Sequence, residues 1–558
     1  MVLSLILCAQ DARLTKLVNE LRDEKSLQRR EDVQQQIEQL LRSAKELRGQ
    51  ARDVVAREGD SDTRERVQSA LLRSPWRECS AVPVRNGYDY QLLSFGSHAL
   101  LWGAGRYEPD GKKWSYLNEA WLIDPAGGEW KKIDAPPIEW RRDPHVACVG
   151  GRLVLWGGKR GTVETQSGVS KMPDRAWEEQ RTFGDGAIWD GHKWVKMAES
   201  TLQPPWSVVA WVDDKLFIWG GLDLRRDGAI WNVETNAWTK VPDAPFEPRV
   251  LVHCVASSGQ VWIWGGRSRA GEDKKLYPGK SHLDGAIYDL SKGTWEKIPQ
   301  SSLTAEAYAV VTLDGTRLFV WGGAVFADGK VQPTSSGAYY ERSSRTWSPL
   351  GAAPLEPGYH YATYVGSGKL YIWGGHRNEP WRDDRQETTL RGAMLDLATG
   401  KWEQIASCPL GSRVRPNLSW VGDRLLVWGG TAPQGPCDVA KADVLSDGAT
   451  LDLTKNSWTK FQLGSISGSQ PSVQVRHGEG HFHWVDSTWT LLSIDVKEGP
   501  RWKVAPVNQG AVWRDGTWQA FDGSLVIKDQ GASATWVAPR LIVYAHGTGR
   551  IYVLEPFE

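Results

Sequence analysis

The feature that most constrains the fold is a short motif that recurs at nearly regular intervals. The triplet Trp-Gly-Gly occurs at Trp156, Trp219, Trp264, Trp321, Trp373 and Trp428, and a Trp-Gly-Ala-Gly variant occurs at Trp102. The intervals between successive copies are 54, 63, 45, 57, 52 and 55 residues. A period of this size indicates a repeat architecture, in which each copy is one supersecondary unit.

Each unit contains two predicted β-hairpins. The triplet ends an apolar run that follows another β-like run across a short turn, as in SVVAWVDDKLFIWGG. After a loop of variable length comes a second hairpin, such as DGAIWNVETNAW, which ends on one of Trp194, Trp238, Trp295, Trp347, Trp402 and Trp458. Two hairpins without an intervening helix give four strands per unit. A four-stranded unit repeated in this way predicts the blade of a β-propeller, and therefore an all-β fold.

Composition agrees with this fold and excludes one class of partner. The chain has 32 Trp and 58 Gly but only 4 Met and 10 Phe, which is typical of strands separated by tight turns. Lys and Arg together number 67, as do Asp and Glu, so the net charge is zero. We therefore expect no nucleic-acid partner, because nothing in the overall charge attracts phosphate.

The end of the chain predicts how the propeller closes. HFHWVDSTWTLLSID and QGAVWRDGTW are a degenerate unit, and ATWVAPRLIVYAHGTGRIYVLEP supplies three strands of a last one. SPWRECS, around Trp76, resembles the missing outer strand, and its pairing with the C-terminal strands would remove an open sheet edge. Residues 76–558 then hold nine repeat units, with seven or eight blades as the alternatives.

The residues before Trp76 follow a helical pattern. In 11–75, charged residues alternate with apolar ones at three- and four-residue spacings, which predicts a long amphipathic helix followed by a short one. Gly59 is expected to end the first, and Asp62, three residues before Glu65, to cap the second. The apolar stripe is expected to pack on the main domain or on a partner helix, so oligomerisation through 11–75 is one consequence.

Residues 1–10 contain an apolar run too short to span a membrane. We interpret this run as the remnant of a signal peptide, and hence the protein as exported to the periplasm or the extracellular space. A cytoplasmic location is the alternative. We expect no transmembrane segment in the remaining chain.

The repeats resemble those of the kelch family of propellers. That family has a diglycine at the end of the second strand, an aromatic residue in the third and a Trp in the fourth, as in WGGLDLRRDGAIWNVETNAW. PRVLVHCVASSGQVWIWGG resembles its first two strands. The resemblance implies that the loops between strands two and three, and those leading into strand one, share a face at the pore mouth that usually binds partners. The kelch-like fold is also used by copper radical oxidases and by sugar mutarotases.

Residues that recur in every unit are expected to maintain the repeat, so ligand contacts are sought where units differ. The basic residues near the predicted pore mouth are the ligand-binding candidates: Arg141, Arg142, Arg225, Arg226, Arg249, Arg267, His376, Arg377, Arg413 and Arg415. A carboxylate-bearing sugar or an acidic peptide would suit such a set. The alternative is that these arginines tie blade to blade through main-chain carbonyls and acidic partners.

Catalytic and metal motifs are sparse. The sequence contains no HExxH, GxSxG or P-loop, and HGEGHFH is better explained as a solvated strand start than as a metal site. We expect no cofactor. Cys408 and Cys437, in neighbouring loops of one blade, are a candidate disulfide that would agree with export. The sequence favours a non-catalytic module that binds a protein or carbohydrate; a carbohydrate-active enzyme of the same fold is the alternative.

Overall fold

The structure is a computed structural model that describes most of residues 2–554. The positions outside the description are 1, 44–46, 74–75, 80–90, 104, 108–113, 117, 142–143, 161–180, 201, 203–207, 221–225, 251, 269–280, 304–308, 328–329, 377–386, 415, 422, 430–444, 446, 463–472, 478–479, 486–491, 495–500, 504–508, 515–516, 523–531, 538–539, 546–548 and 555–558. The chain divides into two compact units, Met1–Ile133 with Leu463–Glu558, and Asp134–Gln462.

The N-terminal segment of the first unit is helical, with more helices than expected. The described residues form α1 (Val2–Asp23), α2 (Leu27–Ser43), α3 (Leu47–Arg57) and α4 (Ser61–Arg73). The predicted break at Gly59 is confirmed, but the single long helix before it is wrong. The Glu24 side chain accepts hydrogen bonds from the main-chain N–H groups of Lys25 and Ser26 (2.9 and 2.8 Å), which helps to end α1.

The cap of α4 also lies two residues earlier than predicted. Asp60, rather than Asp62, accepts the N–H of Thr63 at 2.7 Å. Asp62 instead pairs with Arg66, four residues later, at 2.8 Å. An Asp directly before Ser61 therefore competes successfully for the capping position, although the Asp62–Glu65 spacing has the form of a capping box.

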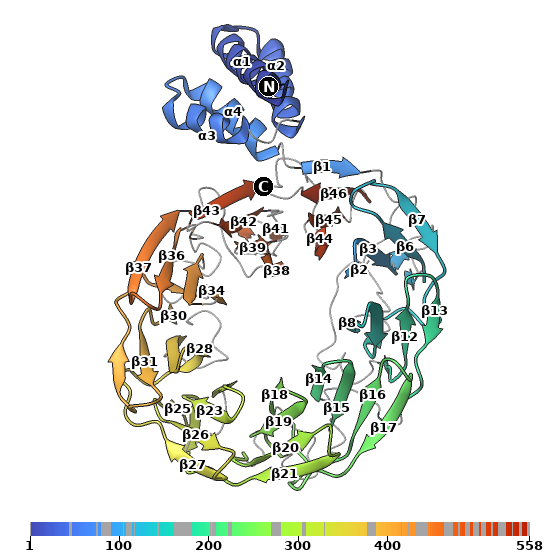
Figure 1. The fold of residues 1–558 in the computed structure, drawn as a ribbon, viewed down its shortest axis with the longest axis vertical. Coiled ribbons are helices and arrows are strands. Elements are labelled where there is room, and N and C mark those ends of the chain that lie inside the picture. The colour runs from blue at the N-terminus through green and yellow to red at the C-terminus, as the bar shows by residue number, and fades with distance from the viewer. Residues whose placement is uncertain are drawn as a thin grey trace. The chain divides into compact units, whose positions relative to one another are not determined.

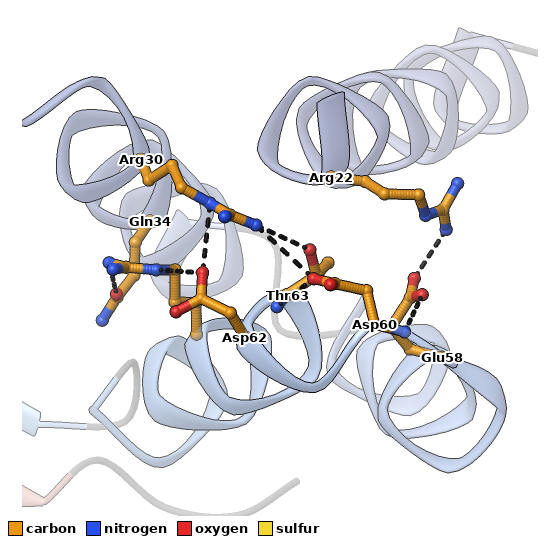
Figure 2. A network of polar contacts seen from close by, with 8 residues as sticks. Arg22, Arg30, Gln34, Glu58, Asp60, Asp62 and Thr63 are labelled. Carbon is orange, nitrogen blue, oxygen red and sulfur yellow. Dashed lines mark hydrogen bonds and ion pairs between the residues drawn. The ribbon is translucent and has the colours of Figure 1, made fainter. Parts of the chain in front are cut away.

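The apolar stripe of the helical segment is buried within the segment itself. Residues from all four helices form one cluster: Leu14, Leu17, Val18, Leu21, Val33, Ile37, Leu40, Leu41, Leu47, Ala51, Val67 and Ala70. Ion pairs surround this core (Figure 2): Arg22 of α1 meets Glu58 at 2.5 Å, and Arg30 of α2 meets Asp60 and Asp62 at 3.4 and 3.0 Å. Of the two expected partners, the main domain or another helix, the described apolar residues pack on helices of the same segment.

The first unit also holds the sheet that combines both ends of the β region. Strand β1 (Trp76–Cys79) pairs antiparallel with β46 (Ile551–Leu554), in the register Trp76↔Leu554, and β45 (Arg540–Ala545) and β44 (Ala532–Val537) complete four strands. This confirms the predicted N-terminal closing strand. Two further sheets contain β2 (Gln91–Phe95), β3 (His98–Trp102), β6 (Ala120–Ile123) and β7 (Trp130–Ile133), and β38 (Val473–His477), β39 (Gly480–Val485), β42 (Gln509–Arg514) and β43 (Thr517–Asp522).

The second unit is a succession of four-stranded antiparallel repeats (Figure 1). Their strands are β8 (His145–Val149), β9 (Arg152–Trp156), β12 (Gly186–Trp189) and β13 (Trp194–Lys196); β14 (Val208–Val212), β15 (Lys215–Trp219), β16 (Gly228–Asn232) and β17 (Ala237–Val241); β18 (His253–Ser257), β19 (Gln260–Trp264), β20 (Gly285–Asp289) and β21 (Thr294–Ile298); β22 (Val310–Leu313), β23 (Arg317–Trp321), β26 (Gly337–Glu341) and β27 (Thr346–Pro349); β28 (Tyr359–Gly366), β29 (Lys369–His376), β31 (Gly392–Asp396) and β32 (Trp402–Gln404); β34 (Asn417–Val421), β35 (Arg424–Trp428), β36 (Asp447–Asp452) and β37 (Ser457–Gln462).

The described strands thus give eight four-stranded sheets and one of six strands, so each of the nine repeat units has a sheet. The chain is an all-β protein of propeller type, and the number of blades stays a prediction. The boundary between 11–75 and 76–558 also stays a prediction, although α4 ends at Arg73 and β1 begins at Trp76. Within the described residues, no helix combines the length and the apolar character needed to cross a membrane.

The recurrent tryptophans join each repeat to the next. Rings of triplet and outer-strand tryptophans pack across successive repeats, with centroid distances of 5.9 Å for Trp156–Trp238, 6.1 Å for Trp264–Trp347, 5.2 Å for Trp321–Trp402 and 5.9 Å for Trp373–Trp458. The outer-strand indoles also donate to main-chain carbonyls of the preceding repeat at 2.7–2.8 Å, at Ala198, Pro242, Pro299, Leu350 and Ala406. These residues are scaffold, as predicted.

Candidate functional site: the loop face of the repeats

One edge of the sheets in the second unit gathers the parts of the repeats that differ most. We call this edge the loop face: it is where each first strand begins, each second strand ends and each third strand begins, as the register His253↔Trp264↔Gly285 illustrates. Pairings between successive repeats occur there. Thr334 bridges to Gly358, and β30 (Glu387–Thr388) pairs with β33 (Arg413–Val414). The connections between strands two and three therefore lie beside the segments that lead into the next first strand.

Several connections between strands two and three extend as β-ribbons beyond the four-stranded sheets. In the second unit these are β10 (Lys159–Arg160) with β11 (Arg181–Thr182), and β24 (Ala324–Ala327) with β25 (Lys330–Pro333). The first unit has β4 (Gly105–Tyr107) with β5 (Trp114–Tyr116), and β40 (Leu492–Ile494) with β41 (Arg501–Lys503). These ribbons differ between repeats in length and sequence, as ligand-contacting loops on a repeated scaffold do.

Three of the candidate arginines form the same buried structure in three repeats. The Arg249 guanidinium contacts the Asp284 carboxylate at 2.7 Å and donates to the carbonyls of Glu247, Gly265 and Asp284 at 3.0, 3.2 and 3.3 Å. Arg141 repeats this with Asp185 (2.5 Å), and Arg413 with Asp447 (3.1 Å). We call this arrangement the Arg–Asp clasp. It fastens the start of strand one to the end of strand two and the start of strand three.

Burial argues against these three arginines as ligand contacts. Each side chain is only 1% exposed, and its donors are directed at protein carbonyls and a carboxylate. The alternative interpretation of the sequence is therefore the better one, with one correction: the clasp joins strands of one repeat rather than one blade to the next. Arg267 is also buried, at 4% exposure, within a bridge between Val250 and Ser281.

The acidic partners of the clasp were missed by sequence reasoning, although a signal was present. Asp185, Asp284 and Asp447 are each the Asp of an Asp-Gly-Ala motif, and an Arg precedes the first strand in the same three repeats. The β22–β27 repeat has Ser336 at this position and the β28–β32 repeat has Arg391. The β14–β17 repeat has Asp227 at this position but no Arg before its first strand, so every Arg of this kind has its Asp but not the reverse.

Exposed charges that are specific to one repeat remain on the loop face. Arg226, a sequence candidate, is 48% exposed and pairs with Asp243 at 3.2 Å, while its carbonyl accepts the Trp219 indole N–H at 2.7 Å. Arg391 is 65% exposed and lies 4.0 Å from Glu356. Glu247 is exposed and lies 4.0 Å from the buried His282. These groups are positioned by the scaffold but are open to water.

The other candidates are described in part or not at all. Arg142, Arg225, Arg377 and Arg415 lie outside the described residues, and so does Cys437. His376 is in β29, where its main chain pairs with Tyr359 and Thr388, and Thr388 pairs with Arg413. The register thus brings His376 and Arg413, from neighbouring repeats, into one row. Cys408 is a free cysteine in the structure, and the Cys408–Cys437 disulfide stays a prediction.

Histidine and cysteine side chains near the loop face are shifted toward their neutral forms. His145 and His253 pack on Trp156 and Trp264, and loss of water contact lowers the pKa of both imidazoles. Burial raises the pKa of the Cys254 thiol to about 12. Within the described part of the chain, no group of three or more His, Cys, Asp or Glu residues is arranged to hold a metal ion.

Comparison with known proteins supports the repeat assignment. The chain is 23% identical to Kelch domain-containing protein 1 of Mus musculus over 346 residues, which is 58% of this chain and 69% of the relative. It is 23% identical to Kelch domain-containing protein 2 of Bos taurus over 285 residues, 44% of this chain and 66% of the relative. It is 24% identical to N-acetylneuraminate epimerase of Haemophilus influenzae (strain PittEE) over 343 residues, 51% of this chain and 84% of the relative.

A solved structure described as "Structure of YjhT" matches with a TM-score of 0.35 at 14% identity, covering 58% of this chain and 99% of the other. No family profile matches the chain. The fold assignment therefore depends on the sheets and on the curated relatives. The diglycine repeats, the four-stranded antiparallel sheets and the two kelch relatives support the similarity of this chain to the kelch-repeat β-propellers.

Proposed function

We propose that the protein is a non-catalytic binding or scaffolding module whose loop face takes a protein or carbohydrate partner. The observation that carries this proposal is the division of polar residues on that face. Those that recur, the Arg–Asp clasps, are buried and used by the fold. Those that differ between repeats, such as Arg226 and Arg391, are exposed and weakly paired. Repeat-specific exposed charge on a rigid scaffold is what recognition of a partner requires.

A glycan and peptide array tests this proposal. The full chain is compared with Arg226→Ala and Arg391→Ala, and with Lys292→Ala as the matched control. Lys292 is an exposed cation, 69% accessible, that pairs with Asp289 in the turn between β20 and β21, at the opposite edge of its sheet from the loop face. We expect at least one loop-face variant to lose binding and the control to keep it. Equal binding by all four proteins would show that the exposed arginines of this face are not the recognition site.

Export is part of the same proposal, and oligomerisation through residues 11–75 is a separate question that can be tested beside it. We infer an exported protein from the apolar run in residues 1–10, and a disulfide between Cys408 and Cys437 would agree with it. Intact mass with and without reductant tests the disulfide. Sedimentation with and without residues 1–75 tests oligomerisation through 11–75; the described apolar residues of that segment already pack on one another, so we expect no large change in mass.

A carbohydrate-active enzyme is the second candidate, and the relative named N-acetylneuraminate epimerase is the observation that favours it. The relevant measurement is NMR of N-acetylneuraminate incubated with the full chain. Faster interconversion of its anomers or epimers than in buffer would show that the protein is a sugar isomerase of this fold, and the binding proposal would be abandoned. A rate equal to the buffer control would leave the binding proposal in place.

A further inference from the structure

The interface between the β18–β21 repeat and the β22–β27 repeat has a core rich in aromatic side chains. Its buried cluster includes Trp262, Trp264 and Tyr340 together with Ile287, Ile298, Leu318 and Val320, and the ring of Trp347 packs against it. Trp262 meets Tyr340 edge to face at 6.4 Å, Tyr340 meets Trp347 at 5.6 Å, and Trp347 meets Trp264 at 6.1 Å. Four rings with polar edges are therefore packed together at one interface.

Three polar atoms of these rings have no hydrogen-bond partner among the described residues. They are the indole N–H groups of Trp262 and Trp264 and the hydroxyl of Tyr340. The three side chains are 1%, 3% and 0% exposed, so bulk water does not reach them. The Oγ of Ser301, which is 6% exposed and follows β21, is unpaired in the same way.

The neighbouring repeat satisfies the same positions with protein groups. Trp219, which corresponds to Trp264, donates to the Arg226 carbonyl at 2.7 Å. Trp231, which corresponds to Tyr340, donates to the side-chain oxygen of Asn236 at 3.1 Å. The positions therefore do not exclude hydrogen bonding, although the indoles of Trp321 and Trp373, which also correspond to Trp264, likewise lack a partner among the described residues.

The free-energy cost of burying these three groups without a hydrogen-bond partner is too large for them to remain unpaired. A buried donor without a partner costs roughly 1–3 kcal/mol, so three would cost roughly 3–9 kcal/mol, comparable to the whole stability of a typical domain. The two indoles can only donate, so they cannot satisfy each other, whereas the Tyr340 oxygen can also accept. A water molecule supplies what is missing, since it accepts from an indole and donates to an oxygen.

We propose that this interface is an internal hydration site, in which ordered water accepts hydrogen bonds from Trp262 and Trp264 and lies within reach of the Tyr340 hydroxyl. The ligand is water rather than a larger molecule, because the surrounding side chains are buried. The site belongs to the scaffold between two repeats, so its existence does not depend on the proposed partner of the loop face.

Water-to-indole NOE measurements on the full chain, labelled with 15N in its tryptophans, test the site. Trp262→Phe, Trp264→Phe and Trp219→Phe assign the three indole signals. We expect cross peaks to long-lived water at Trp262 and Trp264 and none at Trp219, whose N–H is held by a carbonyl. A signal at neither or at only one of the two, or an equal signal at Trp219, overturns the proposal.

Two further measurements keep the result unambiguous. In Tyr340→Phe the cross peaks must persist, because their loss would assign them to exchange of the hydroxyl proton and not to bound water. If the tryptophan variants do not fold, a crystal structure of the unaltered chain at a resolution that shows waters decides the question. Density within hydrogen-bond distance of both indole nitrogens supports the site, and dry packing refutes it.

Discussion

Replacement of Arg249 by alanine should destabilise the protein far more than replacement of an exposed arginine on the same face. Arg249 places one guanidinium against the Asp284 carboxylate at 2.7 Å, three main-chain carbonyls and the ring of Phe246, whose centroid is 4.3 Å away. Truncation removes one donor from each of these oxygens, although the Asp284 carbonyl still accepts the N–H of Gly265 at 3.0 Å. Loss of one partner from a buried ion pair typically costs 3–5 kcal/mol.

The lower end of that range applies here. The Asp284 side chain remains 21% exposed, so water can solvate part of the carboxylate after the arginine is removed. We therefore expect Arg249→Ala to lower the free energy of unfolding by about 3 kcal/mol. Arg226→Ala breaks a pair whose two side chains are about half exposed, and we expect a loss below about 1 kcal/mol.

Urea denaturation followed by tryptophan fluorescence measures both values, and Asp284→Ala with the double variant completes a thermodynamic cycle. The two single losses should be strongly non-additive, because either change breaks the same clasp. Two results would refute the structural role assigned to the clasp. One is a loss of unfolding free energy in Arg249→Ala that lies within about 0.5 kcal/mol of the loss in Arg226→Ala. The other is additivity of the losses in Arg249→Ala and Asp284→Ala.

Three other predictions follow from burial and sheet pairing. Burial lowers the folded-state pKa of His253, so the unfolded chain binds a proton at this residue more readily than the folded chain does. The free energy of unfolding should therefore fall as the pH drops below about 6.5. Urea titrations at several pH values should show a weaker fall in His253→Phe. At pH 8, mass spectrometry of alkylated native protein should show Cys254 reacting about a thousandfold more slowly than an unperturbed thiol, with normal reaction after unfolding. Deletion of residues 1–73 should leave the β sheets stable, whereas deletion of 1–79, which also removes β1, should lower the midpoint of thermal unfolding and promote aggregation; equal midpoints would contradict the role of β1.

Much of the β fold could be predicted because the information is repeated. Each copy of the diglycine and of the outer-strand Trp gives an independent estimate of the same hairpins, and the leftover strand at Trp76 follows from completing the last unit. The helical segment has no such redundancy. Its apolar spacing indicated helix correctly, but the break after Asp23 depends on Glu24 accepting the N–H groups of Lys25 and Ser26. A local side-chain contact of this kind is not visible in hydrophobic periodicity.

The candidate site was harder to predict than the fold, because residue type does not determine whether a side chain is buried or exposed. Arg226 and Arg249 have the same charge and lie on the same face, yet one is half exposed and the other is buried. The difference depends on Asp284, which is 35 positions beyond Arg249 in the sequence and is brought close only by the pairing of β18, β19 and β20. Sequence could place both arginines on a face but could not distinguish ligand contact from scaffold.

The pairing of β1 with β46 imposes an order on synthesis. Glu78 and Arg550, which form an ion pair at 2.6 Å beside this strand pair, are 472 positions apart. At roughly 5–20 residues per second, a ribosome needs about 24–94 seconds to make the chain between them. Throughout that interval β1 has emerged without its partner, directly behind a helical segment that can already fold. The first strand of the protein is therefore the last to be paired, and the nascent chain carries an unprotected strand for almost the whole of its translation.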